Sequence, residues 1–173
     1  MLDETDIRAF LSSDYPRLVA GLAFVLGGRA AAEDAVQEAL ARAWERTMRG
    51  ESIESLPGWV AVVAMNLLRS RLRRARVELR ATERLAVRDQ GRADPPSTDR
   101  STEERLDLAR ALGSLPRRQR EAVVLHYFGG LGVADIGRAL RIREGAAKSL
   151  LHRARASLAA ELGRSYREGG PDV

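Results

Sequence analysis

The chain has 173 residues, 45% of them apolar, which is enough to bury a core and excludes a chain that is disordered throughout. It has no cysteine and only two histidines, His126 and His152, which excludes a disulfide framework and a tetrahedral zinc site, so no metal or cofactor is expected. The net charge of +5 gathers in two basic blocks, residues 59–92 and 105–173, and this clustering favours a nucleic acid as partner.

The first half of the chain predicts three helices. Apolar residues recur at helical spacing over residues 7–26, where Gly27-Gly28 provides a stop, and Pro16 is expected to bend this helix. A second helix is expected over residues 31–48, with acidic residues in its first turns, where the helix dipole favours them. A third runs over residues 56–76 and becomes densely basic. No stretch alternates with period two for long enough to predict a sheet.

The second half begins after a segment that is typical of a flexible linker. Residues 89–102 combine two consecutive prolines, a glycine and small polar residues with almost no apolar content. Four short helices are expected beyond it, over residues 106–112, 117–128, 133–140 and 144–162. The tail from residue 163 onward is expected to be frayed.

A helix-turn-helix is predicted between residues 132 and 149, because a short helix, a tight turn and a second helix follow one another there. The second helix opens on small residues, which would let its backbone approach DNA closely. Donors suited to base edges and phosphates then follow at Lys148, Ser149, His152, Arg153 and Arg155. The alternative interpretation is a tight pair of helices with no role in DNA binding.

No pattern in the chain is typical of catalysis. His152 lies on a basic helical face with no carboxylate three or four positions away, and His126 lies among apolar residues, where a packing role is favoured. Neither a glycine-rich phosphate loop nor a pair of carboxylates stands out. We therefore expect a protein that is not an enzyme and has no catalytic residue.

Four segments carry patterns that occur together in one family. Residues 32–44 read Ala-Glu-Asp-Ala-Val-Gln-Glu-Ala-Leu-Ala-Arg-Ala-Trp, and residues 57–66 begin Pro-Gly-Trp-Val and end on an asparagine that arginines follow. Residues 115–125 begin Leu-Pro-Arg-Arg-Gln-Arg-Glu, and residues 148–155 read Lys-Ser-Leu-Leu-His-Arg-Ala-Arg. In this order they resemble regions 2 and 4 of bacterial RNA polymerase sigma factors, in the extracytoplasmic-function (ECF) group of the sigma-70 family.

The resemblance implies an all-α protein of two small helical domains joined by a flexible linker. Region 2 would span residues 5–80, the linker 81–103, region 4 residues 104–163, and a tail 164–173. Such a sigma factor binds RNA polymerase core and directs it to specific promoters for transcription initiation. The implied partners are RNA polymerase core, promoter DNA and an anti-sigma factor.

The resemblance also assigns a docking role to the polar face of the second predicted helix. This face would bind the coiled coil of the largest polymerase subunit, and an acidic helix face does suit a basic protein surface better than it suits DNA. The expected core-binding residues are Asp34, Gln37, Glu38 and Arg42, with Glu33 and Glu45 beside them.

Two DNA surfaces follow from the same resemblance. The loop 46–58 and the helix after it would open and hold the minus-10 element. An aromatic ring, an amide and guanidinium groups suit single-stranded DNA, and the expected contacts are Trp59, Asn66, Arg69, Arg73 and Arg74. Trp59 has a second interpretation as a core residue, which we favour. The minus-35 contacts would be Lys148, Ser149, His152, Arg153 and Arg155.

The chain departs from the family pattern around its helix-turn-helix. Arg141 stands at a turn position usually held by glycine, which costs about 1 kcal/mol where a left-handed backbone is required. Arg143 and Ala146 replace a usual Ser and Thr, which removes a helix cap and a hydroxyl. Leu150 replaces a usual Arg. We expect the fold to survive these changes and minus-35 recognition to be altered.

Two rival functions explain less of the chain. A dimeric helix-turn-helix regulator on a palindromic operator uses residues 104–163 but leaves the acidic and basic helices of the first half without a role. An RNA-binding adaptor explains the arginines but not the helix-turn-helix. The chain lacks the roughly 18 uncharged apolar residues of a membrane span and has an acidic start, so we expect no membrane insertion. The expected location is the cytoplasm, where an anti-sigma factor can hold the protein near the membrane.

Overall fold

The computed structural model of the protein describes residues 4–26, 28–82 and 100–168. These residues are helical apart from short connections, and no strand occurs among them, so the all-α prediction is confirmed. Most of the expected linker lies outside the described residues, as do Gly27 and the last part of the tail. The elements are α1 (Glu4–Ala9), η1 (Phe10–Asp14), α2 (Tyr15–Leu26), α3 (Arg29–Met48), α4 (Leu56–Thr82), α5 (Arg100–Ser114), α6 (Arg117–Val123), η2 (Val124–Phe128), α7 (Val133–Leu140) and α8 (Glu144–Glu168).

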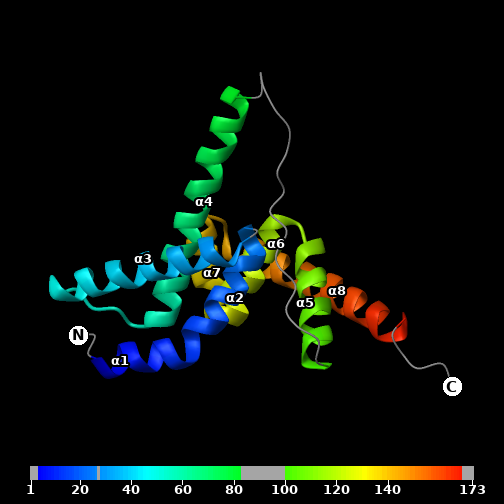
Figure 1. Cartoon of the computed structure of the whole chain (residues 1–173), viewed down its shortest axis with the longest axis horizontal. Coiled ribbons are helices and arrows are strands. Elements are labelled where there is room, and N and C mark those ends of the chain that lie inside the picture. Colours follow the sequence, from blue (N-terminus) through cyan, green and yellow to red (C-terminus); the bar gives the residue numbers. More distant parts are fainter. Residues whose placement is uncertain (1–3, 27, 83–99, 169–173) are drawn as a thin grey trace.

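The first half forms a bundle in which α3 packs against both α2 and α4 (Figure 1). Small residues let α3 approach its neighbours closely, because its inward positions repeat every three or four residues and are mostly alanine. Larger apolar side chains from α2 and α4 fill the space between the helices. The fully buried residues here include Leu18, Leu22, Ala35, Val36, Ala39, Val60, Ala64 and Met65.

The first predicted helix contains a local irregularity just before Pro16. Residues Phe10–Asp14 form a π-helical turn between α1 and α2. Proline has no N–H to donate into the helix ladder and crowds the preceding turn, which is a usual cause of such distortions. The hydroxyls of Ser12 and Ser13 both donate to the carbonyl of Ala9, at 3.0 and 2.8 Å. The expected bend at Pro16 thus takes the form of a widened turn.

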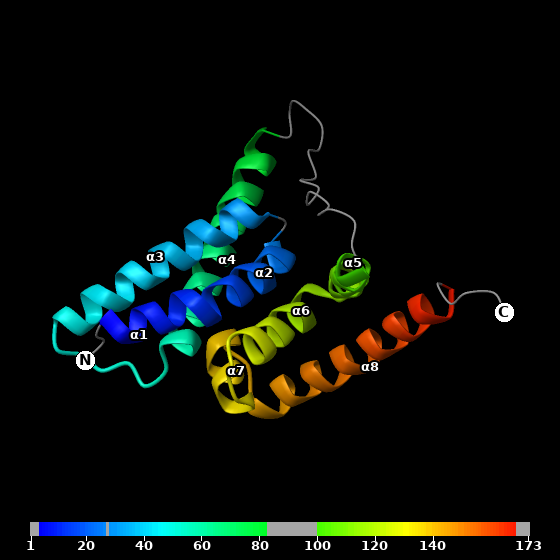
Figure 2. The ribbon, with the colours of Figure 1, turned by 60° about the horizontal axis from the view of Figure 1, so that its bottom comes forward.

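The second half packs α5, α6 and α7 against one long helix, α8 (Figure 2). The helix-turn-helix is present as α7 and α8, joined by a short turn. Three helix ends lie six residues beyond their predicted positions, and one of them is the start of α5, at Arg100 instead of residue 106. α8 continues through Gly163 to Glu168, although fraying was expected there, and α4 continues to Thr82 rather than ending near residue 76. A single glycine costs a helix only about 1 kcal/mol, which favourable neighbours can outweigh.

Arg141, in the turn between α7 and α8, adopts the left-handed backbone conformation that glycine usually provides. Arg141 has φ 55° and ψ 50°, and is the only described non-glycine residue with positive φ. The amide of Ile142 donates to Gly137 O at 2.9 Å and the amide of Arg141 to Arg138 O at 3.2 Å. This hydrogen-bond pattern is a Schellman motif, which most often carries glycine at the left-handed position.

We expect Arg141→Gly to raise the free energy of unfolding by about 0.5–1 kcal/mol, because glycine removes the steric cost of the left-handed backbone. Urea unfolding followed by circular dichroism measures this change. Arg143→Gly, two positions further on, is the control, and it should leave stability unchanged or lower it. A loss of stability in Arg141→Gly would contradict the prediction.

The two halves share one hydrophobic core. Buried side chains of α2, α3 and α4 and those of α6, η2, α7 and α8 form a single cluster of contacting residues. Phe128 packs against Gly21, where an added Cβ would lie 2.6 Å from the Cγ of the ring. Gly129 packs against Ala61, with a corresponding distance of 2.7 Å between Cβ atoms. The two domains therefore contact each other through positions where only glycine fits.

Candidate nucleic-acid interface and docking face

The four predicted core-binding residues lie together on the outer face of α3. Asp34, Gln37 and Arg42 are exposed and Glu38 is half-buried. Glu38 accepts a hydrogen bond from Arg42 at 2.5 Å, one helical turn further on. These four residues are called the α3 docking face below. It has two carboxylates and one arginine, so its net negative charge suits a basic partner.

Two features of this face were not predicted. Arg71 reaches over from α4, with guanidinium nitrogens 3.4 Å from Glu38 and 3.9 Å from Asp34. Trp44, which follows Gln37 by two helical turns, is 44% exposed, and Met48 is 71% exposed. The helical spacing of Trp44 from Gln37 was the available signal in the sequence. An exposed tryptophan beside charged residues is typical of strong contact points in protein interfaces.

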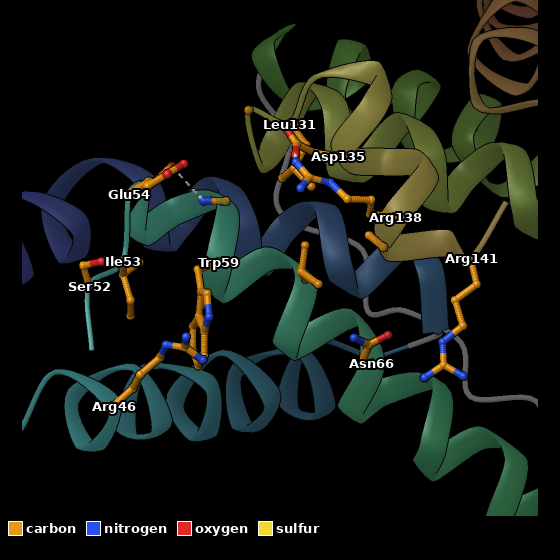
Figure 3. A pocket seen from close by; sticks show the side chains of 15 residues that line it. Arg46, Ser52, Ile53, Glu54, Trp59, Asn66, Leu131, Asp135, Arg138 and Arg141 are labelled. Carbon is orange, nitrogen blue, oxygen red and sulfur yellow. Dashed lines mark hydrogen bonds and ion pairs between the residues drawn. The ribbon is translucent and has the colours of Figure 1, made fainter. Parts of the chain in front are cut away.

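The predicted minus-10 residues Trp59 and Asn66 line a cleft of about 660 Å³ between the two domains. Trp59 is half-buried and packs against the core, as the favoured interpretation has it, while Asn66 is exposed. Figure 3 shows Arg46 beside Trp59 on one side of the cleft, and Arg138 and Arg141 on the side formed by the second domain. The Nε atom of Arg46 is buried without a hydrogen-bond partner among the described residues.

Arg69 does not face solvent as a free phosphate contact would. It donates two hydrogen bonds to the carboxylate of Glu121 on α6, at 3.1 and 2.5 Å, and one to Ala139 O at 3.3 Å. Arg117 donates to the same carboxylate at 2.9 Å. The side chain of Glu121 is 1% exposed. We call Arg69, Arg117 and Glu121 the interdomain cluster, since it joins α4 of the first domain to α6 of the second.

Glu121 is ionised within this cluster. Burial by itself raises the pKa of its carboxyl group, but the hydrogen bonds and charges of Arg69 and Arg117 outweigh burial, so the pKa lies below its ordinary value. The sequence spacing of Arg117 and Glu121, four residues apart, was a signal for their pair. Nothing in the sequence indicated Arg69 as the second partner, because 52 positions separate it from Glu121.

A second arginine on α6, Arg120, joins three chain segments through backbone carbonyls. It donates to Phe24 O near the end of α2 at 2.9 Å, to Gly113 O at 2.7 Å and to Leu115 O at 2.9 Å. The last carbonyls of a helix lack partners within the helix, and a cation there also meets the negative end of the dipole. Desolvation lowers the pKa of Arg120, which the charge of Glu121 partly offsets. Arg120 thus caps a helix of the other domain.

The remaining predicted minus-10 arginines are on the surface. Arg73 and Arg74 are exposed on α4, and neither forms an ion pair or hydrogen bond with another described residue. Arg73 lines a second cleft with Arg69, Arg117, Arg118 and Arg141. Positive charge therefore gathers along α4 and across to the turn of the helix-turn-helix.

Most predicted minus-35 residues are on the outer side of α8. Ala147, Leu151 and Ala154 face the core, whereas Lys148, His152 and Arg153 are exposed. Ser149 is exposed too, and its hydroxyl donates to Gly145 O of the same helix at 2.9 Å. Leu150 is half-buried against the core, so this departure from the family pattern adds to packing.

Arg155 makes contacts within its own domain. Its Nε donates to the hydroxyl of Tyr127 at 2.8 Å and its Nη2 to His126 Nε2 at 3.2 Å. Because Arg155 is a donor only, His126 Nε2 accepts, and Nδ1 carries the proton that is donated to Leu131 O at 2.8 Å. His126 is therefore a hydrogen-bonded, half-buried residue that orients Arg155.

No group of three or more metal-ligating side chains occurs in residues 4–26, 28–82 and 100–168. Within the same ranges, no helix is long and apolar enough to cross a membrane.

Comparison with known proteins defines the class. Residues 11–78 match the family model of Sigma-70 region 2, and residues 105–158 match that of Sigma-70, region 4. These are the two halves that contain the α3 docking face and the helix-turn-helix, in the order that the sequence predicted.

Individual relatives narrow the class further. The chain is 33% identical over 129 residues to the ECF RNA polymerase sigma factor SigL of Mycobacterium tuberculosis. This match covers 73% of this chain and 71% of SigL. It is 30% identical over 147 residues to the ECF RNA polymerase sigma factor SigW of Bacillus subtilis, covering 80% and 79%. A solved structure of the sigma factor RpoE from Bartonella quintana, in complex with the anti-sigma factor NepR, is similar with TM-score 0.67 and 26% identity, covering 91% and 97%. The chain belongs to the ECF group of RNA polymerase sigma factors.

Proposed function

We propose that this sigma factor docks RNA polymerase core through the α3 docking face and brings two DNA surfaces to a promoter. The observation that carries the proposal is the exposed acidic face of α3 within the segment that matches Sigma-70 region 2. Trp59, Asn66, Arg69, Arg73 and Arg74 would serve the minus-10 element. Lys148, Ser149, His152, Arg153 and Arg155 would serve the minus-35 element.

The proposed domains follow the same division. Residues 5–80 form the core-binding and minus-10 domain, and residues 104–163 form the minus-35 domain, with a linker over 81–103 and a tail from 164. As with other sigma factors, the chain would initiate transcription without catalysing a reaction. We propose that it acts in the cytoplasm and is regulated by an anti-sigma factor, since the similar sigma factor RpoE forms a complex with the anti-sigma factor NepR.

The dimeric repressor or activator is not favoured as an alternative function. A helix-turn-helix regulator has no need of a Sigma-70 region 2, yet residues 11–78 match that family. The match also gives a role to the acidic and basic helices that the rival leaves unused.

The experiment that tests the proposal is co-elution of the purified chain with RNA polymerase core in gel filtration. We expect a stoichiometric complex that starts transcripts from promoter DNA which core alone does not use. A chain that elutes apart from core at micromolar concentration would overturn the proposal.

We expect Arg73→Gln to weaken binding of the holoenzyme to different promoters alike, because Arg73 contributes phosphate affinity. The logarithmic slope of affinity against salt should fall by about 0.7–0.9. Fluorescence anisotropy at several salt concentrations on two promoters measures it. A loss restricted to one promoter would show instead that Arg73 reads bases.

A further inference from the structure

A cleft of about 740 Å³ lies between α4, α6 and the turn that follows α7. Arginines dominate its wall, and Glu121 is the only carboxylate among the described residues that line it. Five guanidinium groups and one carboxylate give this wall a net charge of +4. It is called the basic cleft below, and its arginines are Arg69, Arg73, Arg117, Arg118 and Arg141.

Most of the charge of the basic cleft is not neutralised by acidic residues. Glu121 is already shared by Arg69 and Arg117, and Arg118 comes only within 3.9 Å of it. The side chains of Arg73 and Arg141 form no ion pair or hydrogen bond with another described residue. Like charges that gather in one concave site repel one another, and an anion bound among them relieves this repulsion.

The inner part of the basic cleft is held in position by contacts within the chain. The side chains of Arg69 and Arg117 are only 18% and 37% exposed. Arg69 and Arg118 donate to the carbonyls of Ala139 and Leu140, at 3.3 and 3.1 Å. Arg117 uses only its Nε atom in the interdomain cluster, so its two Nη groups have no partner among the described residues. Guanidinium groups that are already oriented bind phosphate oxygens at a small cost in side-chain entropy.

The shape of the basic cleft favours a small ligand. One wall belongs to α4, and the other belongs to α6 and the turn after α7. Figure 3 shows the side chain of Arg141 extending from the second domain toward α4, on which Asn66 lies. Two or three directly linked phosphate groups match this concentration of charge better than a DNA strand does, because a sugar separates the successive phosphates of DNA.

The basic cleft adjoins the cleft that contains Trp59, because Asn66 and Arg141 line both. The ring of Trp59 is half-buried, and aromatic rings of this kind stack on nucleic-acid bases. The amide of Asn66 offers both a donor and an acceptor. A nucleotide whose phosphates lie in the basic cleft therefore has an aromatic ring for its base in the adjoining cleft.

We propose that the basic cleft binds the polyphosphate group of a small ligand, either inorganic polyphosphate or a nucleoside triphosphate. Arg73, Arg117, Arg118 and Arg141 hold the phosphate oxygens, while Arg69 stays paired with Glu121. This site goes beyond the proposed function, and its occupation requires neither polymerase nor DNA.

Thermal unfolding of the full chain, without polymerase or DNA, tests for the site. Tripolyphosphate and ATP are added separately, and a ligand at about a hundred times its Kd should raise the unfolding midpoint by about 5–10 °C. Sodium sulfate at the same ionic strength is the control for general effects of salt and should raise the midpoint less. Equal midpoints in tripolyphosphate, ATP and sulfate would overturn the inference.

Calorimetric titration with tripolyphosphate locates the site. Arg118→Gln and Arg141→Gln should each weaken binding about tenfold, because each removes a charged donor. Arg143→Gln is the matched control, since Arg143 is exposed and removes the same charge but does not line the basic cleft. It should leave the affinity nearly unchanged. Equal losses in all three variants, at equal helicity by circular dichroism, would show binding to the overall charge and refute the site.

Tryptophan fluorescence distinguishes the two sources of the polyphosphate group. Trp44→Phe leaves Trp59 as the only tryptophan of the chain. ATP that binds more tightly than tripolyphosphate and quenches Trp59 identifies a nucleotide, whereas equal affinity without quenching identifies the phosphate groups alone. Both results support the site. A single-stranded oligonucleotide whose binding needs Arg118 and Arg141, when that of tripolyphosphate does not, would assign the cleft to DNA and overturn the inference.

Discussion

Charge reversal of the α3 docking face, Asp34→Arg with Glu38→Arg, is expected to weaken binding to RNA polymerase core by about 2–5 kcal/mol. Both carboxylates are accessible in the free chain, with side-chain exposures of 69% and 41%. On docking they would become buried against basic groups, and reversal leaves like charges facing each other. A pull-down titration against core measures the loss.

The variant should remain folded. The partners of Glu38, Arg42 and Arg71, are themselves exposed, and exposed ion pairs contribute about 0–1 kcal/mol to stability. Glu4→Arg is a matched control for the single change Glu38→Arg, because each removes an ion pair with an arginine four residues later. Unchanged core affinity in the double variant, at normal helicity, would show that core binds elsewhere.

Removing the carboxylate of the interdomain cluster is expected to have the largest effect on stability. Glu121→Ala should lower the free energy of unfolding by about 3–5 kcal/mol, because the guanidiniums of Arg69 and Arg117 lose their buried counter-charge. Urea unfolding measures the change. Asp135→Ala, which removes the exposed pair with Arg138, is the control and should cost less than about 1 kcal/mol. Equal effects of the two substitutions would contradict this role of Glu121.

The pH dependence of stability provides a second measurement on Glu121. Its pKa is lower in the folded chain than its ordinary value of 4.5, so its stabilisation is complete above that value. The contribution is lost as the pH falls through the lower, folded pKa. Glu121→Gln should therefore show a smaller loss of stability between neutral and acidic pH than the wild type. Parallel pH curves would show that other carboxylates dominate acid unfolding.

The sequence was sufficient for the helices and for the exposed surfaces because both depend on local pattern. Spacing of apolar residues located α2, α3 and α7, and the four residues of the α3 docking face lie where helical periodicity put them. Helix ends were less predictable. The tail from residue 163 onward was expected to be frayed, but α8 continues to Glu168.

The partners of Arg69, Arg120 and Arg155 could not be predicted, because hydrogen bonds between distant segments leave no periodic trace. An arginine on a basic helix was interpreted as a phosphate contact. Arg73 is exposed, as such a contact requires, whereas Arg69 is paired with the buried Glu121. For the buried Glu121, the sequence spacing indicated only the local partner, Arg117. Contacts between the domains also depend on close packing at Gly21 and Gly129, which is possible because these residues have no side chain.

The cap that Arg120 places on α2 also bears on the order in which the protein is made. The carbonyl to which Arg120 donates belongs to Phe24, 96 positions earlier in the chain. Synthesis proceeds from the N-terminus, so the residues of the first bundle leave the ribosome before residue 120 does. During that interval the carbonyl of Phe24 lacks its hydrogen bond from Arg120, and Gly21 lacks its contact with Phe128. The contacts of the nascent first domain are thus completed only by a residue of the second domain, which leaves the ribosome later.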